Sequence, residues 1–426
     1  MKKMTTEEIK HAFLNYFQSN GHLIIPKSGI IPKNDPTLLF INAGMAPLKD
    51  YFLQKAVPPS KRLTNYQDCI RLIDIDSIGD SYHGTSFRMM GSWSFGDYFK
   101  EDSIELAFRL ITEVFGFPKD RLYATVFVND GTLPGVPDDH ESAEIWKKYL
   151  PADHIIPSPP SDNFWGPPGS SGPCGPCTEV FFDRGESFGS PRDSKDTLIS
   201  GRHIEIWNAG VFMEYFMDEE KNISLLPQKC VDTGAGMERF AMILQDKDSI
   251  HEIDQYDAPF SLIKEKLSDL KWSRIVFDHL KTSLLMLQSG IKPGNQKEGY
   301  LLRRLMRRSL AGVYLNGCDL KESDDFLILI SKHLEKPTGA CVADEEVFSA
   351  FRNESGLFSS MLAKNKKYFD KIIVDGAITG DYAFELKATR GVPEDLIREL
   401  CNKYGIAFPE DDFFERMMQH KEASRK

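Results

Sequence analysis

The stretch VDTGAGMER, residues 231–239, is the most informative part of the chain. It places a carboxylate (Asp232), two glycines and an arginine close together, and the residues that follow continue as an amphipathic helix. Gly234 and Gly236 let the backbone approach a ligand where a Cβ atom would clash. Arg239 carries a planar guanidinium that can contact a phosphate or lie on an aromatic ring. The stretch predicts a turn from a strand into a helix beside a ligand; an ordinary turn with a surface ion pair is the alternative.

Composition narrows the class of protein. With 426 residues, 41% hydrophobic and 27% charged, the chain can bury a large core and form two domains. A net charge of −11 gives no overall signal for nucleic acid, so any RNA contact needs a local basic patch. Seven scattered cysteines argue against a disulfide framework and for a reducing cytoplasm. No apolar run could span a bilayer, and the N-terminus lacks the pattern of a signal peptide, so we expect no membrane contact.

The periodicity of the apolar residues divides the chain. We expect a helix over 5–20, capped by Thr5 or Thr6, and antiparallel strands over 62–72 and 85–94. Residues 157–176 are dense in proline, glycine and serine and predict an ordered loop. Strands are predicted at 122–128, 178–182, 203–208 and 211–216. Beyond about residue 245 helical periodicity dominates, which predicts two domains, 1–245 and 246–426.

Several motifs together resemble one enzyme family, the alanyl-tRNA synthetases: PKNDPTLLFINAGM (32–45), GSWSFGDYFK (91–100), GPCGPCTEVFFD (172–183), VDTGAGMER (231–239) and GYLLRRLMRRS (299–309). The resemblance implies an α+β fold, with the antiparallel sheet of class II synthetases flanked by helices and followed by a mostly α-helical domain. It covers the family's adenylation domain and its helical tRNA-recognition domain. We expect no editing domain and no C-terminal module in this chain, as in a divergent or reduced member.

The resemblance implies amino-acid activation, in which a carboxylate attacks the α-phosphate of ATP and pyrophosphate leaves. This step needs in-line positioning and cations on the developing charge. Arg71, Asp232 and Arg239 match the family's catalytic residues: Arg71 holds the α-phosphate and the substrate carboxylate, and Asp232 binds the substrate ammonium. Adenine is expected between Arg239 and Phe87. Surface ion pairs for the arginines and a core position for Phe87 are the alternatives.

Other residues are expected around the same ligands, with ATP and Mg²⁺ as cofactors. The further ATP-binding residues are Arg88, Met89, Glu179 and Gly236. The amino-acid pocket is expected to contain Met45, Trp165, Asn208, Val211 and Gly234. For Glu179, which could face ATP and its Mg²⁺ ions, a structural or surface carboxylate is an equal alternative.

The pair Cys174 and Cys177 forms a C-x-x-C that could be half of a zinc site or a redox pair. No second cysteine pair lies at a suitable spacing, so we expect no structural zinc. The family carries the same loop as part of its active-site wall.

The prediction of RNA binding depends mainly on the motif at 299–309. On a helix, Arg303, Arg304, Arg307 and Arg308 form one basic stripe that could contact the phosphates of a tRNA acceptor stem. By resemblance, Asn295 contacts a G·U wobble pair of that stem. A solvated charged face and an ordinary loop asparagine are the alternatives.

Three departures from the family pattern affect these expectations. Arg88 stands where the family has a glutamate, which reverses a charge beside ATP and could add a phosphate contact or disturb adenine binding. His83 stands alone where the family has a histidine pair. Ala388 replaces the aspartate that assists the asparagine on the G·U pair. The nearby Lys387 and Arg390 favour contacts to the RNA backbone over base readout.

Three functions follow, in order of preference. The first is activation of alanine and its transfer to tRNA(Ala), by a cytoplasmic monomer. The second is a paralogue that activates a small amino acid and transfers it to a non-tRNA acceptor, which the loss of the aspartate at Ala388 favours. The third is a non-catalytic RNA-binding relative, which the reversed charge at Arg88 keeps open.

Overall fold

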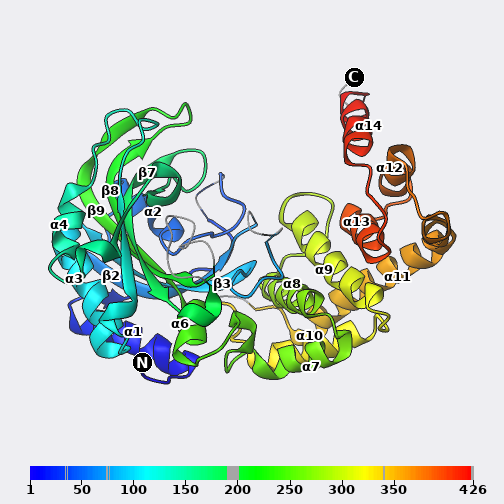
Figure 1. The fold of residues 1–426 in the computed structure, drawn as a ribbon, viewed down its shortest axis with the longest axis horizontal. Helices are drawn as coiled ribbons and strands as arrows, with labels where there is room; N and C mark the ends of the chain where they lie inside the picture. The colour runs from blue at the N-terminus through cyan, green and yellow to red at the C-terminus, as the bar shows by residue number, and fades with distance from the viewer. Residues whose placement is uncertain are drawn as a thin grey trace. The chain divides into compact units, whose positions relative to one another are not determined.

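A computed structural model describes residues 1–33, 35, 37–72, 75, 77–189, 201–338 and 341–423. It divides the chain into two compact units: residues up to 257 apart from 77–80, and residues 77–80 together with 258 onward. The first unit holds the β-sheet, and the second is helical (Figure 1). No helix of the described residues is long and apolar enough to cross a membrane.

The first unit is built on one nine-stranded sheet with the order β1-β2-β3-β9-β8-β7-β4-β5, and β6 pairs with β7 off this path. The strands are β1 Leu23–Ile24, β2 Arg62–Ile70, β3 Ser86–Phe95, β4 Leu122–Phe127, β5 Ile155–Ser158, β6 Phe164–Trp165, β7 Gly172–Asp183, β8 His203–Met217 and β9 Ile223–Gly236. All pairs from β2 to β4 along the sheet are antiparallel, whereas β1 with β2 and β4 with β5 are parallel. The expected α+β class is confirmed, with a mixed sheet whose centre is antiparallel.

The helices of the first unit flank this sheet (Figure 1). They are α1 Thr6–Ser19, α2 Lys49–Phe52, α3 Lys100–Arg109, α4 His140–Trp146, α5 Pro160–Asn163 and α6 Met237–Leu244, with a π-helical turn at Leu110–Val114 and short 3-10 turns at Ala46–Leu48, Lys119–Arg121, Ala152–His154, Glu186–Phe188 and Ile250–Glu252. The expected N-cap of the first helix is confirmed, because the Thr5 side chain accepts from the backbone of Glu8 in a capping box.

The two faces of the sheet bury different cores. On one face, Trp207 of β8 packs against Phe13 and Phe17 of α1 and Phe240 of α6. The other face carries a second apolar cluster that includes Trp93 of β3. Successive residues of a strand point to opposite faces, so Asn208, the neighbour of Trp207, is directed to this second side. The candidate site lies there.

Two sequence expectations about the strands were wrong in detail. The last five residues of the predicted loop 157–176 belong to β7, and within that part Gly175 and Pro176 pair with β6. The strands predicted at 203–208 and 211–216 are one continuous strand, β8, which carries a bulge between Asn208 and Val211. The proline- and glycine-rich stretch and the glycine at the bulge were interpreted as ends of strands. In the structure, ladder hydrogen bonding continues through β7 and β8 at these positions.

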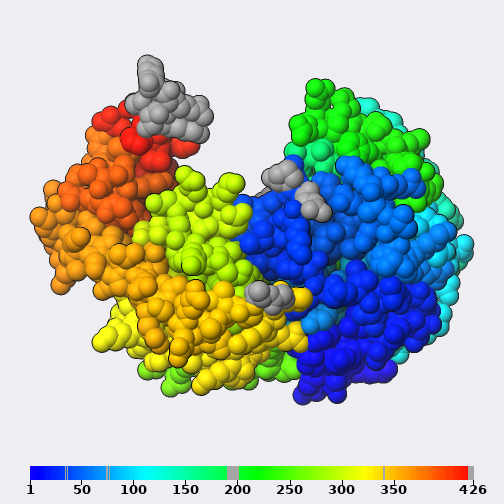
Figure 2. Space-filling view, turned by 180° about the vertical axis from the view of Figure 1, so that it is seen from behind, coloured from blue at the N-terminus to red at the C-terminus, as the bar shows by residue number. Residues whose placement is uncertain are grey.

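The second unit is helical throughout its described part. Its helices are α7 Asp257–Leu267, α8 Leu270–Gln288, α9 Lys297–Leu315, α10 Glu322–His333, α11 Asp344–Asp375, α12 Gly380–Ala388, α13 Glu394–Lys403 and α14 Glu410–Ala423. Helix α11 reaches the surface of this unit, where its residues are yellow-orange in Figure 2. Its buried positions recur every three or four residues and bury one stripe against the unit: Val347, Phe351, Glu354, Phe358, Leu362, Asn365, Phe369 and Ile372.

Candidate active site

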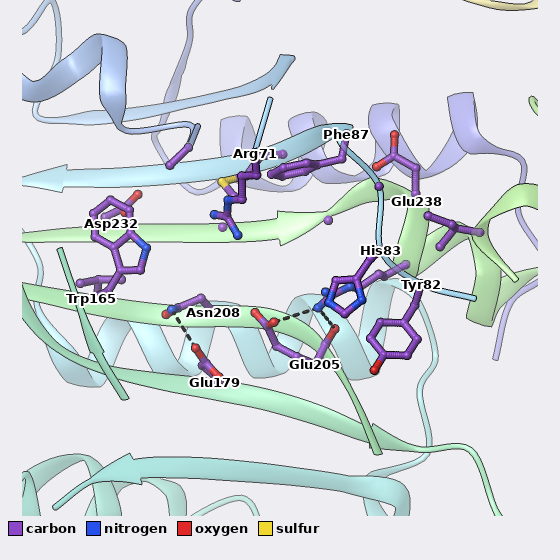
Figure 3. A pocket seen from close by; sticks show the side chains of 18 residues that line it. Arg71, Tyr82, His83, Phe87, Trp165, Glu179, Glu205, Asn208, Asp232 and Glu238 are labelled. Atoms are coloured by element: carbon purple, nitrogen blue, oxygen red, sulfur yellow. Dashed lines mark hydrogen bonds and ion pairs between the residues drawn. The ribbon is translucent and has the colours of Figure 1, made fainter. Parts of the chain in front are cut away.

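A cavity opens on the central strands of the sheet (Figure 3). Charged, polar and aromatic side chains converge on it, as is usual for a ligand site. Eleven of the residues expected at the site line it: Arg71, Phe87, Met89, Trp165, Glu179, Asn208, Val211, Asp232, Gly234, Gly236 and Arg239. The motifs of the sequence, which lie far apart along the chain, thus converge on one cavity.

Strand register explains how the amino-acid residues converge. In the β8–β9 ladder, Asn208 lies opposite Gly234 and Val211 opposite Asp232, so three residues of β8 span two of β9. A bulge adds one residue to a strand and re-aims its side chains. Asn208 and Val211, three positions apart, therefore both line the cavity, which regular alternation would not allow.

Asp232 is a buried acid at one end of the cavity. It is 7% exposed, and its Oδ1 accepts a hydrogen bond from the indole Nε1 of Trp93 at 2.7 Å. Burial raises the pKa of Asp232 to about 7, although the Trp93 hydrogen bond and the charge of Arg71 act in the opposite direction. Its second oxygen accepts from no other described residue, so it is available to a cationic ligand.

Arg71 and Phe87 form a cationic and aromatic wall. The Arg71 guanidinium lies over the Phe87 ring, with its carbon 5.1 Å from the ring centroid. Its Nε donates to the carbonyl of Asn42 at 2.9 Å, which orients the group. The terminal nitrogens donate to no other described residue, so they can serve a ligand in the cavity.

Arg239 lies across the cavity on α6. Its Nη1 donates to the carboxylate of Glu205 at 2.8 Å and to the Glu205 carbonyl at 3.1 Å. Its guanidinium also lies 5.8 Å from the ring centroid of Tyr82. Arg239 and Phe87, between which adenine is expected, thus line the same cavity. Arg239 already contacts Glu205 and Tyr82, and Phe87 already contacts Arg71.

Two carboxylates, Glu179 and Glu205, line the same cavity and repel each other electrostatically. Burial raises the pKa of Glu179 well above its ordinary value, and the negative charge of Glu205 raises it further. The amide of Asn208 donates to Glu179 at 3.4 Å (Figure 3). Two close acids of this kind are suited to share a divalent cation with substrate phosphates.

Two expected site residues do not line the cavity. Met45 is fully buried in the apolar cluster beneath it. Arg88 lies between Phe87 and Met89 on β3, and both of these neighbours line the cavity. Alternation along the strand directs Arg88 away from it, so the expected direct contact between Arg88 and ATP is not supported by this geometry.

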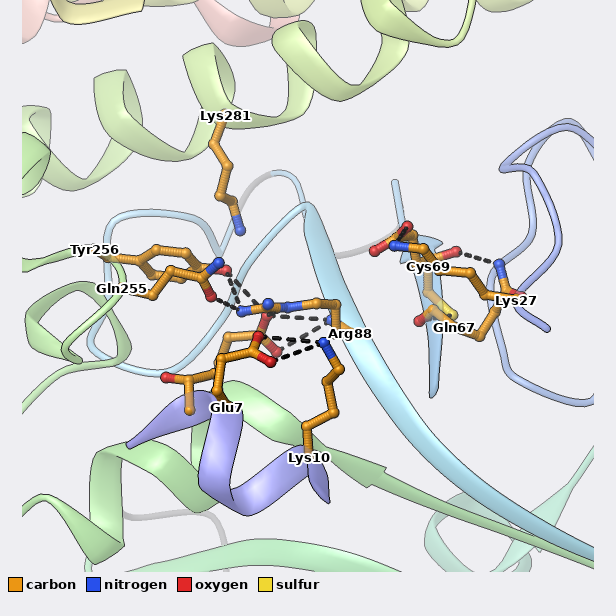
Figure 4. A network of polar contacts seen from close by, with 12 residues as sticks. Glu7, Lys10, Lys27, Gln67, Cys69, Arg88, Gln255, Tyr256 and Lys281 are labelled. Atoms are coloured by element: carbon orange, nitrogen blue, oxygen red, sulfur yellow. Dashed lines mark hydrogen bonds and ion pairs between the residues drawn. The ribbon is translucent and has the colours of Figure 1, made fainter. Parts of the chain in front are cut away.

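Arg88 instead joins a buried polar network (Figure 4). Its Nε donates to the carboxylate of Glu238 at 3.2 Å, and its backbone N–H donates to the same carboxylate at 3.1 Å. Its Nη2 donates to Gln255 and, at 3.4 Å, to the hydroxyl of Tyr256. The Tyr256 hydroxyl in turn donates to Glu238 at 3.0 Å. The reversed charge noted in the sequence is therefore balanced by Glu238, which lines the cavity from α6.

Some residues of the site were not expected from the sequence. The cavity is also lined by Tyr82, Glu205 and Glu238, and Trp93 donates a hydrogen bond to Asp232. His83, the histidine noted in the sequence as a departure from the family pattern, lines the cavity as well. Glu238 and Trp93 lie inside motifs that were recognised, VDTGAGMER and GSWSFGDYFK. The signal was therefore present, but nothing in the spacing distinguished a residue that supports the cavity from one that packs in the core.

Helix α9 carries the four predicted RNA-binding arginines, and each of them has a partner within the second unit. Glu354 of α11 accepts from Nε of Arg303 at 3.2 Å and from Nε of Arg307 at 2.6 Å. Arg304 pairs with Asp395 at 3.5 Å. Arg308 donates to Nε2 of the buried His279 at 3.3 Å; burial lowers the pKa of this histidine. The basic stripe is thus partly neutralised by its own unit.

Glu354 occupies a core position of α11, so its charge should matter for stability. We expect Glu354→Gln to lower the free energy of unfolding by about 1.5–3 kcal/mol, the usual worth of hydrogen bonds to charged groups. The reason is that Glu354, 3% exposed, pairs with both Arg303 and Arg307. Urea unfolding followed by circular dichroism measures the change. Glu345→Gln, on an exposed position of the same helix, is the matched control; equal stabilities of the two variants would contradict the prediction.

The other polar residues expected near RNA also form contacts within the second unit. The Asn295 side chain accepts from Arg303. Lys387 pairs with Glu394 at 2.7 Å, and Arg390 pairs with Glu385 at 2.6 Å. Ala388 ends helix α12 and offers no side-chain acceptor. Any RNA bound here must therefore compete with intramolecular ion pairs for these basic groups.

The C-x-x-C pair lies in β7 beside the cavity. Cys174 and Cys177 are both buried, and burial raises the pKa of Cys174 to about 12 and that of Cys177 well above its ordinary value. Both are therefore neutral thiols at physiological pH. Among the described residues, no group of three or more His, Cys, Asp or Glu side chains is arranged to hold a metal ion.

Comparison with known proteins gives one consistent result. The sequence profile of the tRNA synthetases class II (A) matches residues 8–426. The chain is 35% identical over 451 residues to an alanine-tRNA ligase of Acetivibrio thermocellus, covering 100% of this chain and 49% of that protein. It is 36% identical over 440 residues to one of Borreliella afzelii, covering 99% of this chain and 73% of that protein. The chain spans about half the length of curated relatives such as that of Acetivibrio thermocellus.

Proposed function

The chain belongs to the tRNA synthetases of class II (A), and on that premise we propose that it activates alanine with ATP and transfers the alanyl group to the 3′ end of tRNA(Ala). The observation that carries the proposal is the cavity that joins Arg71, Asp232 and Arg239. An acid for an ammonium group and two cations for phosphates are what amino-acid activation requires.

In the proposed first step, a carboxylate oxygen of alanine attacks the α-phosphorus of ATP. A phosphorus–oxygen bond forms to the carboxylate, and the bond to pyrophosphate breaks. The terminal nitrogens of Arg71 hold the α-phosphate and the substrate carboxylate in line, while Asp232 pairs with the ammonium. Arg239, from the other side of the cavity, contacts the nucleotide and bounds the adenine site with Phe87.

The cavity also fits the Mg²⁺ that accompanies ATP. Mg²⁺ is held by one or two carboxylates together with substrate phosphates, and Glu179 and Glu205 are two such carboxylates in the wall. Their mutual repulsion, which contributes to the raised pKa of Glu179, would be relieved by a cation between them. When bound, the ion offsets negative charge on the phosphates.

Trp165, Val211 and Asn208 line the cavity beside Asp232. Because the large Trp165 ring and the branched Val211 side chain occupy the space next to this acid, we propose alanine, with its single methyl group, as the amino acid. One methylene is worth only about 1–3 kcal/mol of discrimination, so glycine and serine should be weaker substrates rather than excluded ones.

The acceptor is proposed from helix α9 of the second unit. Its four arginines can contact the phosphates of an acceptor stem, and Asn295 adds a polar group beside them. Because Ala388 offers no acceptor for a guanine amino group, we propose that readout of the G·U pair is weaker than in the family pattern. We further propose a cytoplasmic monomer, because seven scattered cysteines are typical of a protein of a reducing compartment.

A second function is favoured by one observation. Each arginine of the α9 stripe is already partnered inside the second unit. A chain with this partly neutralised surface and with Ala388 could transfer the activated amino acid to a non-tRNA acceptor. Charging assays with tRNA(Ala) separate the two functions, because both share the activation step and only the first yields alanyl-tRNA.

The experiment that tests the proposal is ATP–pyrophosphate exchange with each of the twenty amino acids in turn. We expect exchange to be fastest with alanine, with glycine and serine slower by about 10–200-fold, the range for one small group in a pocket. Exchange with another small amino acid would keep the mechanism and overturn the alanine assignment. Absence of exchange with every amino acid, with and without added tRNA, would overturn the activation proposal and favour a binding relative.

A further inference from the structure

We propose that Trp93 is a positioning residue for amino-acid activation: its indole N–H orients the Asp232 carboxylate and favours its charged form, ready for the substrate ammonium. The inference rests on the proposed function and adds to it a residue that does not itself line the cavity.

The geometry of the pair carries the inference. Trp93 of β3 lies directly opposite Asp232 of β9 in the antiparallel ladder. The distance between Nε1 and Oδ1 is 2.7 Å, which is short for a bond from a neutral donor to a carboxylate. Both side chains are buried, and no other described residue donates a hydrogen bond to this carboxylate. Among the residues that the structure describes, Trp93 is therefore the one hydrogen-bond donor that orients this carboxylate.

The indole ring is itself held in place by two glycines. A Cβ atom on Gly91 would lie 2.5 Å from Cζ2 of Trp93, and one on Gly44 would lie 3.0 Å from the same atom. The backbone at these positions thus packs against the ring, and any larger residue would displace it. Gly44 and Gly91 come from two of the motifs quoted above, INAGM and GSWSF. Their role here is to seat the ring that supports Asp232.

The groups around Asp232 explain why its protonation depends on the Trp93 hydrogen bond. Burial raises the pKa of Asp232 to about 7, so close to neutral pH small changes alter how much of it is charged. Arg71, beyond the end of β2, lowers this pKa. Cys69 of β2, whose pKa is raised by burial, is neutral, and the pKa of Glu179 on β7 is likewise raised by burial. The Trp93 hydrogen bond is the larger of the two influences that favour the charged form.

The test is the pH dependence of the KM for alanine in ATP–pyrophosphate exchange, in wild type and Trp93→Phe. Phenylalanine fills most of the same space without an N–H. Loss of the hydrogen bond should move the pH at which alanine binding is half-maximal upward by about one to two units. At pH 7 the KM for alanine should rise by roughly 5–50-fold, the change in charged fraction for that shift. Towards pH 9 it should approach the wild-type value, and the KM for ATP should not change.

Trp207→Phe is the matched control. Trp207 is also fully buried in the sheet, and its indole nitrogen has no hydrogen-bond partner among the described residues. It therefore loses the same volume without losing a hydrogen bond, and its pH profile should match that of wild type. A profile of Trp93→Phe that is unshifted, or a KM raised equally at every pH, would overturn the inference. Wild type inactive with every amino acid would instead overturn the proposed function.

A second measurement does not depend on activity or on the folding of Trp93→Phe. In protein labelled with ¹⁵N at the tryptophan indoles, one indole N–H resonance should shift with pH with a midpoint near 7, following Asp232. That titration should disappear in Asp232→Asn and persist in Trp165→Phe, which removes the tryptophan that lines the cavity. If no indole resonance loses its titration in Asp232→Asn, Trp93 does not sense the carboxylate and the inference is wrong.

Discussion

Asp232→Ala is expected to lower kcat/KM for alanine in ATP–pyrophosphate exchange by about 10²–10³-fold, which corresponds to roughly 3–4 kcal/mol. The reason is that Asp232 is the acid beside the pocket of Trp165, Asn208 and Val211, and without it the substrate ammonium loses its counter-charge in a buried place. The measurement is the dependence of exchange rate on alanine concentration at pH 8, where wild-type Asp232 is mostly charged. The KM for ATP should be unchanged.

Asp232→Asn separates the charge from the shape of this side chain. It keeps an oxygen for the Trp93 N–H and removes the charge, so it should lose activity as the alanine variant does. Its stability should not fall, because a buried aspartate whose pKa is raised from 3.8 to about 7 costs folding free energy as the pH rises through that window. Asp120→Ala, on an exposed 3-10 turn, is the control for a lost aspartate. Wild-type activity in Asp232→Asn would contradict the role given to its charge.

Much of the cavity could be predicted from the sequence because its residues are of types that chemistry restricts. Asp232 and Arg239 stand in a short motif with glycines, and few other side chains could bind an ammonium or a phosphate there. Asn208 and Val211 lie in the cavity only because of the bulge in β8, and no periodicity rule places a bulge. Their match to the family predicted them; their spacing alone would have placed them on opposite faces.

The charged groups that support the site could not be predicted, because their partners are distant in the sequence. Arg88 was interpreted as a group beside ATP, yet its carboxylate partner is Glu238, 150 residues away. The arginines of α9 were interpreted as one basic stripe, yet two of them pair with Glu354, which is 47 residues beyond Arg307 and lies among apolar residues of α11. A sequence pattern predicts the face of a helix or strand on which a charged residue lies. It does not predict which charged residue of another element pairs with it.

Arg88→Met should lower the free energy of unfolding of the first unit by about 3–5 kcal/mol, the cost of leaving one partner of a buried ion pair alone. The Arg88 and Glu238 side chains are 8% and 4% exposed, so water cannot replace the missing guanidinium. Methionine has a similar length without the charge and makes the loss electrostatic rather than a loss of volume. Urea unfolding, followed by tryptophan fluorescence, measures it.

The double variant Arg88→Met/Glu238→Gln tests the cause. With both charges removed, no unpaired carboxylate stays buried, and the new glutamine can still accept hydrogen bonds from the backbone N–H at position 88 and from Tyr256. The double variant should therefore be more stable than Arg88→Met, with a coupling energy of about 1–3 kcal/mol. Additive losses would show that Arg88 and Glu238 act independently. In that case the reversed charge at position 88 would be explained by Gln255 and Tyr256 instead of by the acid that borders the cavity.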